Sequence, residues 1–440
     1  MPRESYPTSK VTLFRRFLHA DPATRWSVIL CLILTTSLRA QERVRTAAGP
    51  LPIQEFKRVP EATFRLGPFD GELGGSAGVE YTDNANLAPS SSKLSRLRFD
   101  QGVDLDVTWV VSHLSQLEII FAGRLNEDLY GNGTNQTNFE IPFSLIQYKF
   151  SISDFRIRLY DSFSYTQDPG LVPTVTNITT LRELTNTTGL NVDANLGLAI
   201  LSLSADFTYS DATASSVQSG SSAAFVNQTA STGSLESLRA EAKVSFPLTQ
   251  TILYGIDTSV TRSTGSTGNV NSLSPGLFIH GKVSPELDFD LAGGLNVVDV
   301  KPSVRLGYYF SGVIRHQTTR NLQVILTASH DLIFTTGTDL TEETYLGIAG
   351  RLKLTRFITV SATPFYRFGN VKTGLTPGTF NTYGVDLILA WKPRKRWTTA
   401  LTYDWTRNQS GTSTSGNIIS ITSNDNYIKN AIAFQISYAF

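Results

Sequence analysis

Large apolar residues alternate with small or polar residues along most of the chain. In the segment 96–111, for example, Leu97 and Phe99 occupy odd positions, whereas Arg96 and Arg98 occupy even ones. A period of two is that of a β-strand, in which successive side chains point to opposite faces. The segment is longer than the usual strand of about five or six residues, and it exceeds the roughly 9–11 residues that cross a bilayer at a tilt.

The same alternation recurs from about Gly71 to the end of the chain. Clear examples are 117–126, 155–165, 201–209, 287–297, 304–315, 343–354 and 383–392. Apolar outward faces and polar inward faces, repeated in this way, are the sequence signature of a transmembrane β-barrel. The fold class predicted is therefore all-β, an antiparallel transmembrane barrel.

The connections between these segments also alternate in length. Tight turns are predicted near 112–115, 151–154, 198–200, 247–250, 283–286, 316–320, 354–357 and 392–396. Mostly longer loops, rich in Ser, Thr, Asn and Gly, are predicted between them, including 127–138 and 211–234. Short periplasmic turns and long extracellular loops are typical of such barrels, and the count indicates about 18 strands. A barrel of 16 strands remains an alternative, because the alternation in 186–196 and 273–282 is weak.

The chain ends on a strand whose large apolar side chains share one face. They are Ile432, Phe434, Ile436, Tyr438 and Phe440. This ending resembles the C-terminal signal of Gram-negative outer-membrane barrels, which the barrel-assembly machinery reads. We expect the strand to close the barrel by pairing with the first one, near Leu73–Tyr81.

The first 70 residues read differently from the rest. Residues 1–40 combine basic residues, a short apolar run from Trp26 to Leu34 and a possible cleavage site after Ala40, which predicts a signal peptide. Prolines spaced through 41–70 favour a periplasmic lead-in segment, which could also fold into the lumen. The barrel is then expected over 71–440, in the cell outer membrane.

Composition narrows the choice of partners. Charged residues make up 17% of the chain and the formal net charge is +1. Soluble domains carry about 25% charged residues, so the chain is charge-poor. No basic stripe stands out, which argues against nucleic acid as a partner. Outer-membrane lipid and the assembly machinery are the expected partners, together with whatever the lumen admits.

One stretch carries a family resemblance. Arg65–Leu87 resembles the opening of outer-membrane β-barrel porins of the porin-2-like family, in which a first strand runs into an Asp-Asn turn, here Asp83 and Asn84. The resemblance implies an outer-membrane location. Some members of that family occur beside exopolysaccharide secretion genes, which leaves a polysaccharide as an alternative cargo.

A barrel of 16 to 18 strands is wide enough to leave an aqueous channel. The first hypothesis is a porin-like channel for passive diffusion of small hydrophilic solutes. The alternative is a barrel component of exopolysaccharide export or a structural outer-membrane protein, for which inner aromatic residues could form stacking platforms. The charged residues expected to line the lumen are Arg96, Arg98, Asp104, Asp106, Glu118, Arg124, Arg156, Arg158, Asp288, Asp290, Arg305, Arg351 and Arg367.

Enzyme chemistry has little support in the sequence. A phospholipase on the lipid-facing side would need a nucleophile and a histidine close together near the outer rim. His330 lies in the apolar register, but the adjacent strands offer no serine there, and Thr344 is the nearest hydroxyl. No metal-ligand spacing or phosphate loop is present, so no catalytic residue, cofactor or metal is predicted.

Overall fold

The chain folds into a closed barrel of antiparallel strands in a computed structural model. The structure describes residues 56, 62–88, 93–167, 180–215, 233–265, 268–300, 303–334, 340–371, 378–412 and 426–440. Eighteen long strands, β2 to β19, pair each with the next in sequence, and β19 pairs with β2 to close the ring. A short strand, β1, pairs only with β2. The predicted all-β barrel of 18 strands is confirmed.

The strands are long throughout, as a tilted membrane crossing requires. Their bounds are β1 Phe64–Leu66, β2 Phe69–Thr82, β3 Arg96–Ser112, β4 Ser115–Tyr130, β5 Asn135–Ile152, β6 Phe155–Thr166, β7 Thr180–Asn195, β8 Ile200–Ser215, β9 Gly233–Pro247, β10 Ile252–Gly265, β11 Gly268–Ser284, β12 Leu287–Val300, β13 Ser303–Gln317, β14 Leu322–Phe334, β15 Leu340–Lys353, β16 Ile358–Val371, β17 Gly378–Arg394, β18 Trp397–Thr412 and β19 Tyr427–Ala439. The two weakly alternating segments, 186–196 and 273–282, thus belong to β7 and β11.

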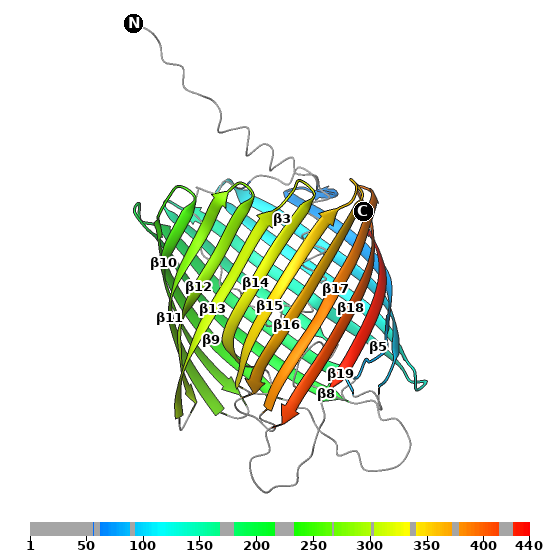
Figure 1. The fold of residues 1–440 in the computed structure, drawn as a ribbon. Coiled ribbons are helices and arrows are strands. Elements are labelled where there is room, and N and C mark those ends of the chain that lie inside the picture. Colours follow the sequence, from blue (N-terminus) through cyan, green and yellow to red (C-terminus); the bar gives the residue numbers. More distant parts are fainter. Residues whose placement is uncertain are drawn as a thin grey trace.

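The two edges of the barrel differ in their connections (Figure 1). One edge carries the tight turns, such as residues 113–114 between β3 and β4 and 395–396 between β17 and β18, and Phe440 lies at this edge. We call it the short-turn edge. The other is the long-loop edge, and most of the loops predicted there lie outside the described residues.

The closing pair has the expected register. Ala431–Ala439 of β19 runs antiparallel to Gly74–Thr82 of β2, with Ile436 opposite Ala77. Phe440 adds a backbone hydrogen bond to the carbonyl of Leu73, 2.8 Å long. The last strand therefore seals the barrel against the first one, as predicted.

Side chains alternate between two environments. On β3, Phe99 and Val103 are 43% and 52% exposed, whereas Arg96 and Arg98 are buried. Exposed large apolar side chains recur around the ring, as on β11, β15 and β19, which gives the barrel an apolar outer surface. Because the polar residues take the opposite face, they line the inside.

Two details differ from the sequence-based expectation. The long loop predicted at 127–138 is wrong: β4 continues to Tyr130, β5 begins at Asn135, and only residues 131–134 connect them. The first barrel strand starts at Phe69, two residues before the boundary that the sequence indicated. The polar composition around Asp128 is typical of a loop, but Asp128 lies on the inner face of β4, where polar residues are also expected. Residues 1–40 lie outside the described part of the chain.

Candidate functional site

The inner wall is the candidate functional site. Its charged side chains form clusters, each of which contains both positive and negative residues. The first, which we call the β2–β5 cluster, lies at the long-loop edge. Arg98 donates two hydrogen bonds to the Asp128 carboxylate, from Nε at 2.7 Å and from Nη2 at 3.1 Å. Arg96 donates to Glu80 at 2.9 Å, and Asn138 donates to Asp128 at 3.0 Å.

This cluster is hidden from solvent. The side chains of Arg96 and Asp128 are each 1% exposed, and that of Arg98 is 9% exposed. Neighbouring Asn84 is fully buried and donates to the carbonyls of Ala88 and Ile428. The two arginines predicted to line the lumen therefore lie on the inner face, but they are packed among neighbouring side chains and have little contact with water.

A second cluster joins β4, β5 and β6 nearer the short-turn edge. Glu118 accepts hydrogen bonds from Gln147 at 2.7 Å and Lys149 at 2.8 Å. Gln147 in turn accepts from Arg158 at 2.7 Å, and the Arg158 guanidinium lies 4.7 Å from the centre of the Tyr160 ring. Glu118 and Arg158, both predicted lumen residues, are thus linked through an amide. This chain of contacts satisfies the charges locally.

The β11–β13 cluster is the most open of the three. Arg315 on β13 bridges Asp288 at 3.0 Å and Asp290 at 2.7 Å on β12, and His280 on β11 also contacts Asp290. The side chains of Arg315 and Asp288 are 34% and 31% exposed. Water therefore reaches these charges, while Asp290 remains buried beneath them at 5% exposure.

Arg367 forms a further buried pair. Its Nε lies 3.1 Å from Glu343 on the neighbouring strand, and both side chains are 7% exposed. The guanidinium also lies 6.0 Å from the centre of the Tyr345 ring, which stacks on Phe365. Like Arg96 and Arg98, this predicted residue belongs to the packed wall.

The other predicted residues are half-buried on strand positions of the inner face. They are Asp104, Asp106, Arg124, Arg156, Arg305 and Arg351. Sequence reasoning left out Asp128, Glu343 and Arg315, which complete the clusters described above. Asp128 was hidden in the mistaken loop, whereas the other two share the polar register of their strands and could have been included.

The outer face carries one polar group that the sequence singled out. The Nδ1 atom of His330 lies 2.8 Å from the Thr344 hydroxyl, and its Nε2 lies 3.5 Å from Glu342. The two residues are direct cross-strand partners, in agreement with the expectation that Thr344 is the nearest hydroxyl to His330. The imidazole stacks on Tyr308 with ring centres 4.2 Å apart, and its side chain is 8% exposed. We interpret His330 and Thr344 as a structural pair that helps to hold β14 against its neighbouring strands on the outer surface.

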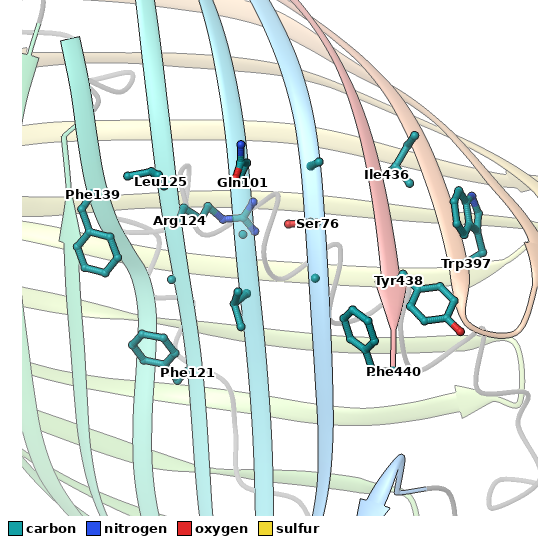
Figure 2. Close-up of a pocket in the computed structure, with 15 residues that line it drawn as sticks. Ser76, Gln101, Phe121, Arg124, Leu125, Phe139, Trp397, Ile436, Tyr438 and Phe440 are labelled. Atoms are coloured by element: carbon teal, nitrogen blue, oxygen red, sulfur yellow. The ribbon is translucent and has the colours of Figure 1, made fainter.

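A groove crosses the outer surface at the closing seam, over β19, β2, β3 and β4 (Figure 2). Its volume is about 760 Å³. The floor consists of small or short side chains, whereas the walls are large and mostly aromatic. The floor is Gly75, Ala77, Gln101, Val103 and Gly123, and the walls are Ile436, Tyr438, Phe440, Trp397, Phe121, Leu125 and Phe139; Ser76, Gly102 and Arg124, which take the inner register of their strands, complete the lining. We call it the seam groove.

No helix in the described ranges is long and apolar enough to cross a membrane. Within the same ranges, no group of three or more His, Cys, Asp or Glu side chains is arranged to hold a metal ion.

Comparison with known proteins gives a likeness of architecture. No protein-family model and no curated protein matches the sequence, so the resemblance to the porin-2-like family has no support from a family match. Among solved structures, OccK7 (OpdD) from Pseudomonas aeruginosa is similar, with 10% identity, a TM-score of 0.47 and coverage of 85% of this chain and 99% of that one. The siderophore receptor PirA from Acinetobacter baumannii is also similar, with 9% identity, a TM-score of 0.41 and coverage of 84% and 80%.

Proposed function

We propose that this protein is a porin-like outer-membrane channel through which small hydrophilic solutes diffuse passively. The observation that carries the proposal is the inner face of the closed eighteen-strand barrel. That face holds charged side chains that water reaches, such as Arg315, Asp288 and Lys149, which are 34%, 31% and 28% exposed. A barrel of this strand number is wide enough for an aqueous channel.

The arrangement of charge supports weak ion selectivity. Rings of one sign make a pore selective for ions of the other sign. Here positive and negative side chains neighbour each other in every cluster, as in Glu118 with Lys149 and Asp288 with Arg315. Their fields largely cancel at a distance, so neutral solutes and ions of either sign would pass.

Several features support the outer membrane as the location. Aromatic side chains such as Trp109, Trp391, Trp397 and Phe246 lie near the short-turn edge, as in the interfacial belts of membrane barrels. Short turns are periplasmic in such barrels, so the C-terminal Phe440 would also face the periplasm. The N-terminal signal peptide expected from the sequence agrees with export.

A conduit for sugar polymers has less support. Of the aromatic residues on the inner face, Tyr309 is 3% exposed and donates to Asp257 at 3.1 Å. Tyr160 donates to Asp206, and Tyr345 stacks on Phe365. Because these rings are engaged within the wall, they do not form a continuous platform for sugar rings. We therefore retain solute diffusion as the proposed function.

Reconstitution in planar bilayers tests the proposal directly. We expect discrete conductance steps that grow linearly with voltage, and a reversal potential close to zero in a salt gradient. Liposome swelling with sugars of increasing size would give the size limit. A barrel that is folded, as judged by its heat-modifiable electrophoretic mobility, but gives neither conductance nor swelling would contradict the proposal.

A further inference from the structure

The seam groove has a composition that sets it apart from the surrounding outer surface. Large side chains fill the outer surface around most of the ring, but at the seam Gly75 and Ala77 of β2 and Gly123 of β4 leave space between larger neighbours. Ala77, Gln101 and Leu125 are successive cross-strand partners, and the next outward-facing row holds Gly75, Val103 and Gly123. The result is a depression in a surface that would otherwise be convex.

The groove begins at the short-turn edge and extends into the membrane. Phe440 and Tyr438 form its wall at that edge, and their rings contact each other with centres 5.2 Å apart. The Phe440 ring lies over Gly75, whose missing side chain makes room for it. From Leu73, which binds Phe440, to Ala77 the strand rises about 13 Å. An extended hydrocarbon chain that enters at the edge therefore has an apolar track to follow.

The edge beside this entrance is strongly basic. Strand β17 ends in Lys392-Pro393-Arg394 and the turn to β18 is Lys395-Arg396; Arg394, Lys395 and Arg396 are exposed. Arg396 directly precedes Trp397, a wall residue of the groove, and its carbonyl accepts a hydrogen bond from the Ala439 amide at 3.0 Å. Three cations thus lie beside the strand that carries Tyr438 and Phe440. The same end of β2, across the junction, carries Asp70, which pairs with Arg65 at 3.3 Å, and Glu72.

We propose that the seam groove and the Arg394–Arg396 turn together form a binding site for one anionic phospholipid. One acyl chain lies in the groove against Val103 and the walls, and the phosphate headgroup lies at the short-turn edge among the three cations. Basic side chains near a membrane surface attract anionic headgroups, and aromatic rings at the same level suit the interface. The groove volume of about 760 Å³ lies within the range of ordinary ligand sites.

Binding at this place has a structural consequence. The groove exists only when β19 is paired with β2, since its two walls come from opposite sides of that junction. Strand β2 contributes Gly75 to the outward-facing side of the pairing, and glycine weakens a strand because it offers no side chain to pack. A lipid that fills the groove would restore that missing packing and hold the seam closed.

Native mass spectrometry of the purified barrel, released from vesicles of equimolar phosphatidylglycerol and phosphatidylethanolamine, tests the proposal. We expect one retained phosphatidylglycerol per barrel. Substitution of Arg394, Lys395 and Arg396 by Gln should lower its retention roughly fivefold for each charge removed that contacts the headgroup. The matched control removes three charges from other short turns, Arg320, Lys353 and Arg356, and should leave retention unchanged.

A second pair of variants tests the groove itself. Val103→Phe fills the floor and should abolish retention of the lipid. Val260→Phe is the control, because Val260 lies on the outer face of β10 and has the same exposure as Val103, 52%. Heat-modifiable mobility checks that each variant is folded, and inorganic phosphate added to the wild type should not displace the lipid.

Three results would overturn the site. The first is equal retention of the two lipids by the wild type, and the second is equal loss in a variant and its matched control. The third is a dimer that Val103→Phe disrupts, since the groove would then be an interface between two copies. None of these readouts depends on conductance. The lipid site could therefore be disproved without affecting the channel proposal, and the channel proposal could be disproved without affecting the lipid site.

Discussion

Two charge clusters of the inner wall, alike in chemistry, differ in how much water reaches them. In the β2–β5 cluster, Arg98 and Asp128 are 9% and 1% exposed. In the β11–β13 cluster, Arg315 and Asp288 are 34% and 31% exposed. Each cluster joins arginine to aspartate across neighbouring strands at hydrogen-bond distance. Since burial sets the energetic role of such a pair, we expect the first to stabilise the packing of the inner face and the second to influence solutes in the proposed channel.

The difference follows from the dielectric surroundings. A buried charge that loses its partner retains the whole cost of its desolvation, whereas an exposed charge is compensated by water and salt. An exposed charge, however, projects its field into the lumen, where passing ions respond to it. Substitutions in the buried cluster should therefore alter stability, and substitutions in the open cluster should alter selectivity.

The largest effect is expected for Asp128→Ala. It removes the acceptor of two hydrogen bonds from Arg98 and a carboxylate 3.8 Å from Arg96, whose hydrogen bond to Glu80 remains. The free energy of unfolding should fall by about 3–5 kcal/mol, since a buried ion pair loses its negative member. Urea unfolding in liposomes, followed by tryptophan fluorescence, measures it. A loss below that of the control, Asp288→Ala, would contradict the division between the clusters.

A somewhat smaller loss is expected for Glu343→Ala. This substitution leaves Arg367, which is buried, without its ion-pair partner at 3.1 Å. The nearby Tyr345 ring retains part of the interaction with the guanidinium, so we expect a loss of about 2–3 kcal/mol. The same unfolding assay applies. Glu343→Gln, which preserves shape and a hydrogen-bond acceptor, should recover part of the loss, and failure to do so would argue against a role for this pair.

Much of this comparison could be predicted from the sequence, but not all of it. The alternation of Leu97 and Phe99 with Arg96 and Arg98 is local, so it defined the strand and its two faces without any tertiary information. Burial of the two arginines is not local. It depends on Asp128, which the polar composition of 127–138 placed in a loop, and on residues from strands that pair only in the folded barrel.

Register was the other missing quantity. A shift interrupts the pairing of β4 with β5 between Ala122 and Arg124, and another interrupts β5 with β6 between Ile141 and Ser144. Such an irregularity changes which residues face the lumen, because one extra residue reverses the alternation. The sequence therefore predicted which side chains are polar and inward, but not which of them meet. Lys149, which pairs with Glu118, is an example: it was not among the residues predicted to line the lumen.

Arg315→Gln should change selectivity with little effect on stability. The bridge to Asp288 is partly solvated, and the buried Asp290 retains its contact with His280 and can accept a hydrogen bond from the new amide, so the loss should be smaller than that for Glu343→Ala. One positive charge disappears from the lumen surface, which should shift the reversal potential in a salt gradient toward cation preference. Arg98→Gln is the matched control, and it should leave the reversal potential unchanged. Equal shifts in the two variants would contradict the assignment of one cluster to the wall and the other to the lumen.

The smallest effect is expected on the outer face, at His330 and Thr344. Thr344→Val removes the hydroxyl that lies 2.8 Å from His330 Nδ1 and should cost about 1 kcal/mol, because a nearly buried nitrogen loses its partner. His330→Phe in the same chain removes that nitrogen while an aromatic ring still stacks on Tyr308. Since replacing both polar partners by apolar groups can be nearly neutral, the double variant should regain most of the stability. A double variant less stable than Thr344→Val would show that the contact between His330 Nε2 and Glu342, 3.5 Å away, contributes more than the hydroxyl pair. Neither variant should alter conductance, because both side chains lie outside the lumen.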